Sequence, residues 1–203
     1  MSTRVKYPNM PQLDEVPIAV REALFEDSYE FEKLDGGNVQ VDMREEVITY
    51  GLRSGYLDGG RAPWVEELNK WYWTSRERIH ELPPGIYYGE FLAPHTIEYK
   101  PEYVNKFVLI DVFDDGEFMD YEAGYERVRQ HGLEDIMLKA PVLHKGKVTM
   151  EEILAMINGK SEFSVNGERE GVVIKDYTTQ TFVKAKHPKF ISNPSLGNDD
   201  SEK

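Results

Sequence analysis

Three runs of residues with strand-like spacing constrain this fold more than any other feature of the chain. They are GIYYGEFL at 85–92, NKFVLIDVFD at 105–114 and EGVVIKDY at 170–177. Each run is short, rich in β-branched or aromatic residues, and bounded by polar or turn-forming residues. Helical spacing occurs between them without the regular strand–helix alternation that a parallel sheet requires. The pattern therefore predicts an α+β fold of mostly antiparallel sheets flanked by helices.

The other elements follow from the same spacing rules. Residues 29–41, YEFEKLDGGNVQV, predict a strand, a turn at Gly36 and Gly37, and a second strand. Further short strands are expected at 47–50 and 140–143, and the segment TFVKAKHPKF at 181–190 is expected to close the folded part. Helices are expected at 12–25, 63–79, 121–131 and 150–158.

Length and local composition set the expected domain organisation. A chain of 203 residues is long enough to bury one good-sized core. The residues at the C-terminal end are polar and interrupted by Pro and Gly, which is typical of a segment that cannot bury enough apolar surface to fold. We therefore expect one folded domain over 1–190 and a disordered tail over 191–203.

Membrane, exported and disulfide-stabilised proteins are all disfavoured by the sequence. No run approaches the ~18–20 apolar residues of a membrane span. The first residues, MSTRVKYPNMPQLDEV, lack the apolar stretch of a signal peptide. The chain has no cysteine, which excludes disulfides and thiolate metal sites. We expect a cytoplasmic protein without a membrane partner.

The charge distribution bears on nucleic-acid binding. The formal net charge of −13 argues against a nucleic-acid partner when the chain is taken as a whole. Residues 139–189, however, hold nine Lys or Arg and only six Asp or Glu. This part of the chain can present a positive surface on an otherwise acidic protein, and we expect it to contact a nucleic-acid backbone.

A lysine stands between a strand and a turn in the segment KLDG at 33–36. Alone, such a match occurs by chance in roughly one chain of this size in twenty-five, and its plainest interpretation is an exposed lysine beside a turn. The match is not isolated. YGEF at 88–91, FVLIDVFD at 107–114, EGVVIK at 170–175 and KAK at 184–186 follow it in that order.

This ordered set resembles the covalent nucleotidyltransferases, the superfamily of polynucleotide ligases and mRNA capping enzymes. The resemblance runs from Glu32 to Lys186, about three quarters of the chain. It implies a nucleotidyltransferase (ATP-grasp-like ligase adenylation) domain in which the lysine of KxDG becomes nucleotidylated. On this basis Lys33 is the nucleophile.

Two features narrow the resemblance to RNA ligases. Asn38 stands where DNA ligases typically carry an arginine, and LRSG at 52–55 is similar to the Arg-bearing loop that follows the nucleophile motif in RNA ligases. Both resemble the RNA ligase 2 type. Asp35 departs from the phage members of that type, which have His there. The resemblance implies an ATP-dependent RNA ligase that seals RNA 5′-phosphate and 3′-hydroxyl ends through a lysyl-AMP intermediate.

The resemblance also implies roles for individual residues. Lys33, Lys184 and Lys186 are the expected catalytic residues. RNA contacts are expected from Asn38 and Arg53, and a metal contact from Glu170. The implied cofactors are ATP and Mg²⁺ or Mn²⁺. The residues expected to bind the nucleotide are Glu32, Asp35, Arg53, Glu90, Phe107, Ile110, Lys175, Lys184 and Lys186.

Physical chemistry is consistent with these roles. A lysine amine attacks phosphorus only when unprotonated, and its ordinary pKa lies near 10.4, so partial burial and neighbouring cations must lower it. Alternation along EGVVIK places Glu170 and Lys175 on opposite faces of a strand, so one of them must act from a strand end. Lys184 and Lys186 share a face, as two phosphate contacts require.

Several alternatives stay open. Ile110 aligns better with the adenine-contacting position of the family, whereas the ring of Phe107 would stack better on a base. A minimal DNA ligase, the core of a GTP-dependent capping guanylyltransferase and a non-catalytic RNA-binding relative would share these motifs. Seventeen residues follow Lys186, too few for the barrel that DNA ligases and capping enzymes append. A separate partner could then supply specificity for RNA ends.

Overall fold

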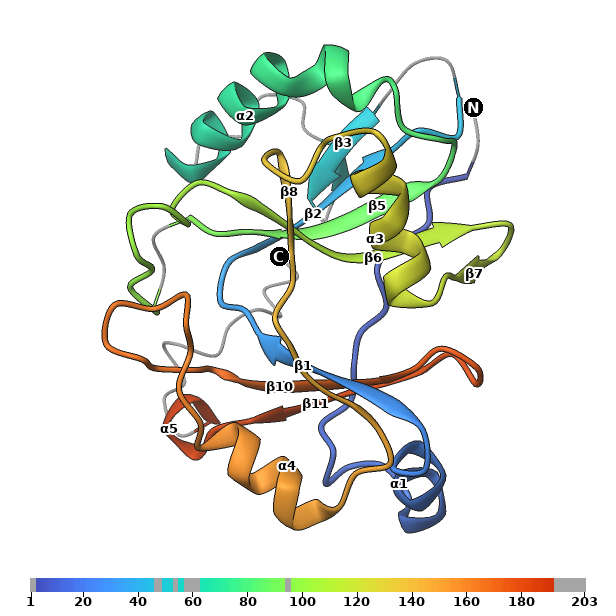
Figure 1. Ribbon diagram of the computed structural model, residues 1–203, viewed down its shortest axis with the longest axis vertical. Coiled ribbons are helices and arrows are strands. Elements are labelled where there is room, and N and C mark those ends of the chain that lie inside the picture. Colours follow the sequence, from blue (N-terminus) through green and yellow to red (C-terminus); the bar gives the residue numbers. More distant parts are fainter. Residues whose placement is uncertain (1–2, 46–48, 53–54, 57–62, 94–95, 192–203) are drawn as a thin grey trace. The chain divides into compact units, whose positions relative to one another are not determined.

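The computed structural model of the chain describes residues 3–45, 49–52, 55–56, 63–93 and 96–191 (Figure 1). The chain divides into two compact units, each with its own sheet and its own apolar core. Unit 1 comprises Met1–Pro8, Gly36–His95 and Pro101–Ala140, and unit 2 comprises Asn9–Asp35, Thr96–Lys100 and Pro141–Lys203.

Within the described residues, unit 1 contains a seven-stranded sheet. Its strands pair antiparallel in the order β4-β3-β2-β5-β6-β7, and β8 pairs parallel with β6. The strands are β2 (Gly37–Asp42), β3 (Thr49–Leu52), β4 (Gly55–Tyr56), β5 (Ile86–Phe91), β6 (Phe107–Asp114), β7 (Glu117–Phe118) and β8 (Met137–Lys139). The register shifts between Tyr88 and Gly89, where a β-bulge interrupts the β5–β6 ladder.

Helices α2 (Pro63–Ile79) and α3 (Tyr121–Gln130) cover one face of this sheet (Figure 1). On α2, the buried residues Leu68, Tyr72 and Ile79 recur at helical spacing and pack into the core of unit 1. On α3, Asp120 caps the first turn by accepting hydrogen bonds from two backbone amides. The boundaries of α2 agree with the helix that the sequence predicts at 63–79.

Unit 2 contains, within the described residues, a four-stranded antiparallel sheet in the order β11-β10-β1-β9. Its strands are β1 (Ser28–Lys33), β9 (Val142–Gly146), β10 (Gly171–Asp176) and β11 (Thr181–Lys186). Helices α1 (Ile18–Leu24) and α4 (Met150–Ile157) lie on one face, and the short α5 (Pro188–Ile191) follows β11 (Figure 1). The antiparallel sheets with flanking helices confirm the predicted α+β class.

Register separates the two faces of this sheet. Val172 and Ile174 of β10 belong to the apolar core beneath α1 and α4. Opposite these two residues, β1 places Glu32 and Glu30, so both glutamates share the core face. Lys33 is the partner of Gly171 and therefore projects from the other face. Sequence neighbours in β1 thus serve different sides of the sheet.

The largest difference from the sequence-based expectation lies at KLDGG. The segment was predicted to be a turn between two strands, which is the arrangement of a hairpin, but β1 and β2 belong to different sheets. The Asp35 carboxylate accepts hydrogen bonds from the amides of Thr96 and Ile97, at 2.9 and 2.8 Å, which fixes the chain after β1. Local turn signals cannot reveal such long-range partners.

Two boundaries also differ. The helix predicted at 12–25 is shorter and begins at Ile18, because Pro17 occupies the N-cap position and ends the preceding extended segment. The strand predicted at 140–143 corresponds to β9, which begins two residues later, at Val142, and a further short strand, β8, precedes it. The predicted tail lies outside the described residues except for Ile191. None of the helices that the structure describes is both long and apolar enough to cross a membrane.

Glu30 provides a stability prediction. Its side chain is fully buried on the core face, the Ser28 hydroxyl donates to Oε1 at 2.6 Å, and Oε2 has no hydrogen-bond partner among the described residues. Burial raises the Glu30 pKa above its ordinary value of 4.5, against a lowering effect of Ser28 and His144. The folded state thus holds this proton more tightly than the unfolded chain.

The stability that Glu30 contributes is therefore complete below pH 4.5 and is lost as pH rises through the raised folded pKa. Glu30→Gln mimics the protonated form at every pH. We expect it to raise the melting temperature by about 2–4 °C at pH 7, and to leave it unchanged near pH 4. Thermal unfolding of both proteins at the two pH values measures this difference. An equal change at both pH values would contradict the assignment.

Candidate active site

Lys33 is the last residue of β1 and its ammonium contacts a buried carboxylate. Lys33 Nζ lies 2.6 Å from Glu170 Oε2, and the Lys33 side chain is only 15% exposed. The second carboxylate oxygen, Glu170 Oε1, lies 2.9 Å from Lys186 Nζ. One carboxylate therefore bridges two ammonium groups from different strands.

This bridge dictates the ionisation of Glu170. Burial opposes the charged carboxylate, but the ion pairs with Lys33 and Lys186 outweigh that cost and hold the Glu170 pKa below its ordinary value of 4.5. The carboxylate is therefore negative at neutral pH.

Strand register explains why these three residues meet. Lys33 pairs with Gly171 across β1 and β10, and Gly171 pairs with Lys186 across β10 and β11. The two lysines thus flank a glycine on one face of the sheet. Glu170 precedes β10 by one residue, and its backbone oxygen accepts a hydrogen bond from His187 N at 2.8 Å. The glutamate reaches the lysines from the strand end, whereas the alternation of EGVVIK predicts only that either Glu170 or Lys175 acts from such an end.

Gly171 leaves no space for a side chain. A Cβ at this position would lie 2.2 Å from the Ala185 backbone oxygen and 2.8 Å from Lys186 Cα. Gly171→Ala must therefore push β11 away, and we expect a loss of about 1–3 kcal/mol in unfolding free energy. Urea unfolding measures this loss. Gly124→Ala is the matched control, because there the methyl group would lie 3.0 Å from Val112 Cγ2, a smaller overlap and with a side chain rather than with the backbone. Equal losses in the two variants would contradict the steric explanation.

The other two predicted lysines lie on the same face of the sheet. Lys184 of β11 pairs with Val173 of β10. It lies two residues before Lys186 on the same strand, so the two lysines point to the same face. Lys175 lies four residues along β10 from Gly171, and its Nζ sits 4.8 Å and 5.5 Å from the ring centroids of Phe31 and Phe182. Lys175 is only 2% exposed, so it is a buried cation held by aromatic rings.

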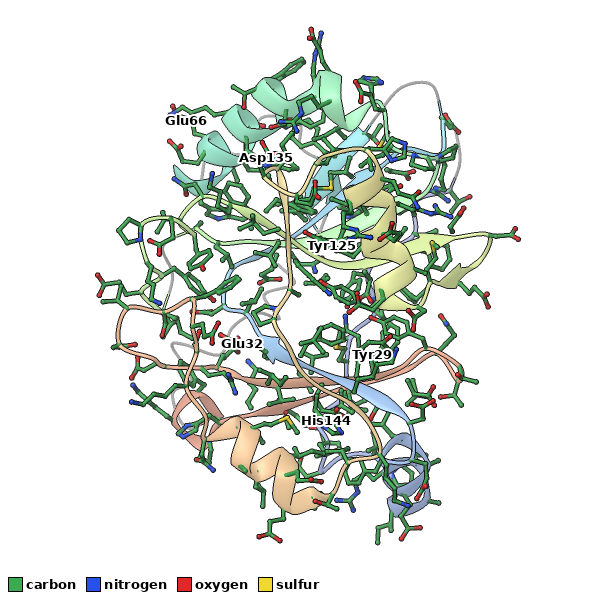
Figure 2. All side chains as sticks on the ribbon, in the orientation of Figure 1. Tyr29, Glu32, Glu66, Tyr125, Asp135 and His144 are labelled. Atoms are coloured by element: carbon green, nitrogen blue, oxygen red, sulfur yellow. The ribbon has the colours of Figure 1, made fainter. Side chains whose placement is uncertain are left out.

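Glu32 is placed differently from the other predicted nucleotide contacts. Its side chain lies on the core face, where Oε2 is 3.4 Å from Arg169 Nε (Glu32 is labelled in Figure 2). Burial raises the Glu32 pKa, against the lowering effect of Ser161 and Arg169. Only the backbone of Glu32 is available to a ligand on the Lys33 face.

Asp35 is buried, and its carboxylate forms hydrogen bonds with backbone amides. Besides accepting from the amides of Thr96 and Ile97, it donates its own amide to the Tyr99 hydroxyl at 2.7 Å. These contacts all lie within unit 2 and fix the chain two residues after Lys33. The predicted nucleotide contact by Asp35 stays a prediction, whereas its structural role was not anticipated.

In unit 1, Glu90 and Asn38 are direct partners across β5 and β2, so their side chains share one face of the sheet. Glu90 Oε1 accepts a hydrogen bond from Gly36 N at 2.9 Å. A Cβ at Gly36 would lie 2.4 Å from the Phe91 backbone oxygen, so only glycine allows this approach. Arg53, the other predicted RNA contact, lies outside the described residues.

The two candidates for the adenine contact differ in burial. Phe107 is fully buried and stacks on Trp71 with ring centroids 4.8 Å apart and an interplanar angle of 8°. Ile110 lies at the β-bulge opposite Tyr88 and Gly89 and is only partly buried. A base could stack on Phe107 only if the core opened. The geometry therefore favours Ile110.

Sequence reasoning missed a polar cluster on β5 and β6. The Tyr7 hydroxyl donates to Asp111 Oδ2, and Tyr88, the strand partner of Asp111, donates to the Val5 backbone oxygen at 2.7 Å. Burial and Asp111 raise the pKa of Tyr7 well above its ordinary value, and Glu90 adds to this effect. A charged residue inside the apolar run FVLIDVFD was the signal for Asp111, but no periodicity points to Tyr7.

The donor chemistry bears on metal binding. Among the described residues, no group of three or more His, Cys, Asp or Glu could hold a metal ion. Mg²⁺ needs no such cage, since it binds through one or two carboxylates with water and substrate phosphates. Glu170 offers one such carboxylate, but both of its oxygens contact lysines. The metal contact by Glu170 therefore stays a prediction.

Three lysines of the predicted positive surface pair with exposed carboxylates. Lys139 pairs with Glu122 and Lys147 pairs with Glu26, in both cases at 2.8 Å, and Lys189 contacts Glu168. Such exposed pairs are weak and can exchange for phosphate contacts, so backbone binding by this surface stays a prediction.

A sequence model of the RNA ligase family matches residues 27–188 of this chain. The chain belongs to the RNA ligase family. Each candidate residue from Lys33 to Lys186 lies within the matched segment. The match does not distinguish among the types of RNA ligase, so the RNA ligase 2 type stays a prediction.

Solved structures support the fold. The chain is similar to Naegleria gruberi RNA ligase with PPi, with a TM-score of 0.73 and 20% identity over 94% of this chain and 58% of that one. A mutant of that Naegleria enzyme with AMP and Mn gives a TM-score of 0.73 and 18% identity over 97% and 60% of the two chains. The chain thus spans about three-fifths of the length of the structures it matches. No curated protein sequence matches it significantly.

Proposed function

We propose that this member of the RNA ligase family is an ATP-dependent RNA ligase that acts through a covalent lysyl-AMP intermediate. The carboxylate bridge from Glu170 to Lys33 and Lys186 is the observation that carries the proposal. It supports a nucleophile that is held in place, partly buried and next to a second cation. The ATP and AMP bound in the Naegleria structures are consistent with this nucleotide.

In the first step, Lys33 Nζ attacks the α-phosphorus of ATP and the bond from that phosphorus to the bridging oxygen breaks. Pyrophosphate leaves with the electron pair of that bond. Lys186 and Lys184 share a face with Lys33 and can neutralise the phosphate charge that develops. In the second step, an oxygen of an RNA 5′-phosphate attacks the phosphorus of the bound AMP, the phosphorus–nitrogen bond to Lys33 breaks, and the lysine amine is released. In the third, an RNA 3′-hydroxyl attacks that phosphate and AMP leaves.

Lys33 must lose a proton before it attacks. Glu170 Oε2, at 2.6 Å, is within proton-transfer distance of the ammonium. The lowered Glu170 pKa makes it a weak base, so the proton passes on to solvent rather than staying on the carboxylate. A bound Mg²⁺ or Mn²⁺ would neutralise charge on the transferring phosphate, and Glu170 is the residue proposed to hold it.

The remaining roles follow the family resemblance. In unit 1, Glu90 is proposed to contact the ribose, Ile110 the adenine, and Asn38 the RNA. Arg53 is proposed to contact phosphate and RNA. In unit 2, Lys175 is proposed to contribute positive charge to nucleotide binding from its aromatic surroundings. The end-sealing activity on RNA and a separate specificity partner are also proposals.

Label transfer tests the proposal. The chain is incubated with α-labelled ATP and Mg²⁺, denatured, and then digested to map the labelled residue by mass spectrometry. We expect AMP on Lys33, linked through a phosphoramidate. Addition of 5′-phosphorylated RNA should then move the label to RNA, and RNA with a 3′-hydroxyl should release AMP. Wild-type protein that never acquires label would overturn the proposal.

Two further substrates separate the alternatives. Labelling with GTP instead of ATP would identify a capping guanylyltransferase core. Sealing of nicked DNA but not of RNA would identify a minimal DNA ligase. RNA binding without any label would identify a non-catalytic relative.

A further inference from the structure

Arg169 and Glu32 are the sequence neighbours of Glu170 and Lys33, and they meet on the other face of the same sheet. Lys33 contacts Glu170 at 2.6 Å on one side, and Glu32 contacts Arg169 at 3.4 Å on the core side. Neighbouring side chains in an extended chain alternate between faces. The segments 32–33 and 169–170 are therefore joined by one ion pair on each face of the sheet.

The core-side pair is tightly enclosed. The side chains of Arg169 and Glu32 are only 7% and 2% exposed. Arg169 also donates to two backbone oxygens, from Nη1 to Met156 at 2.6 Å and from Nη2 to Lys160 at 2.7 Å. One guanidinium therefore joins the end of α4, the segment that follows it, and β1.

Stability alone does not explain such a pair. Removing two charges from water is costly, and apolar replacements of buried ion pairs are often as stable or more stable. A buried pair is better suited to fixing one arrangement of the backbone. Glu170 needs this, because it precedes β10 and is not held by the β1–β10 ladder, which ends at the Lys33–Gly171 pair.

We propose that Arg169 and Glu32 are positioning residues that hold Glu170 where its carboxylate reaches both Lys33 and Lys186. The inference rests on the proposed lysyl-AMP chemistry. Neither residue faces the reacting groups, so their effect is transmitted through the backbone to the two neighbouring residues. Displacement of a reacting group by about 1 Å can cost about a hundredfold in rate.

The proposal predicts which kinetic quantity changes. Loss of the pair should lower the maximal rate of lysyl-AMP formation at least tenfold, because Glu170 is no longer fixed. The ATP concentration that gives half of that rate should change less than twofold, because neither side chain contacts the nucleotide. A purely structural role would instead lower the folded fraction and leave the rate per folded molecule unchanged.

The main variant is the double substitution Glu32→Gln with Arg169→Met. Removing Arg169 alone would leave a buried carboxylate without its cation, whereas the double variant removes both charges and retains similar volumes. Arg169→Lys is the second variant. It keeps the charge opposite Glu32 but cannot donate to both backbone oxygens, so an intermediate rate is expected.

Glu30→Gln is the matched control. Glu30 lies two residues before Glu32 on the same strand and face, is equally buried, and contacts neither Arg169 nor Glu170 in the described contacts. We expect this control to form lysyl-AMP at the wild-type rate.

Single-turnover labelling with α-labelled ATP, normalised to the folded fraction from circular dichroism, decides among the outcomes. Folded double variant with a wild-type rate would overturn the positioning role, while labelling of the wild type would still support the proposed function. If the double variant does not fold, Arg169→Lys decides, and a wild-type rate in that variant would overturn the inference. Absence of label in the wild type would instead reject the proposed function.

Discussion

Lys33→Arg is expected to give a folded protein that forms no covalent adenylate. Arginine keeps a positive charge opposite Glu170, so the carboxylate keeps two cationic partners and unit 2 stays stable. A guanidinium has a pKa above about 12 and is not a nucleophile at neutral pH. Label formation from α-labelled ATP should fall by at least about a thousandfold, since no other group replaces the attacking amine.

A comparison with Lys33→Ala separates the two roles of Lys33, as the nucleophile and as the counter-ion of Glu170. Alanine removes both the amine and the charge, so it should abolish labelling and also lower the melting temperature, because Glu170 then keeps Lys186 as the cation among its described contacts. Lys145→Arg is the control. Lys145 lies on the same sheet, with Nζ 4.4 Å from the Tyr29 ring centroid, and should label normally after this substitution. Label that persists in Lys33→Arg would show that another residue is the nucleophile.

The sequence was informative about the site because its chemistry is carried by short segments. Alternation in KAK correctly predicted that Lys184 and Lys186 share a face. Alternation in EGVVIK predicted that either Glu170 or Lys175 lies at a strand end, and in the structure Glu170 precedes β10. These results depend on residues close together in the chain, whose relative directions follow from the strand period alone.

Features that depend on distant partners were not predictable in this way. The KLDGG segment carries the signals of a hairpin, yet its flanking strands pair in separate sheets. The Arg169–Glu32 pair joins residues far apart in the sequence. The sequence analysis expected Glu32 to bind the nucleotide, and no pattern pointed to Arg169 or to its contact with Glu32. Periodicity also could not choose between Phe107 and Ile110, because a β-bulge changes the alternation between them.

Glu170→Gln is expected to lower the rate of lysyl-AMP formation by about 10²–10³-fold. Glutamine retains the shape of the side chain and one accepting oxygen, but it removes the negative charge that Lys33 and Lys186 share. Glu168→Gln is the matched control, because it removes the same charge two residues earlier from an exposed pair with Lys189. We expect the control to label within about twofold of the wild type.

The pH dependence of the unfolding free energy of Glu170→Gln, compared with the wild type, should also report the ionisation of Glu170. The Lys33 and Lys186 ion pairs, acting against burial, lower the folded pKa of Glu170 below the 4.5 expected for the unfolded chain. Its contribution to stability is therefore present above pH 4.5 and is lost as pH falls through the folded pKa. Glu170→Gln should thus be less stable than the wild type in urea unfolding at pH 7, and the difference should vanish in acid. A difference that persists unchanged at low pH would mean that the shared carboxylate charge does not hold the two lysines together.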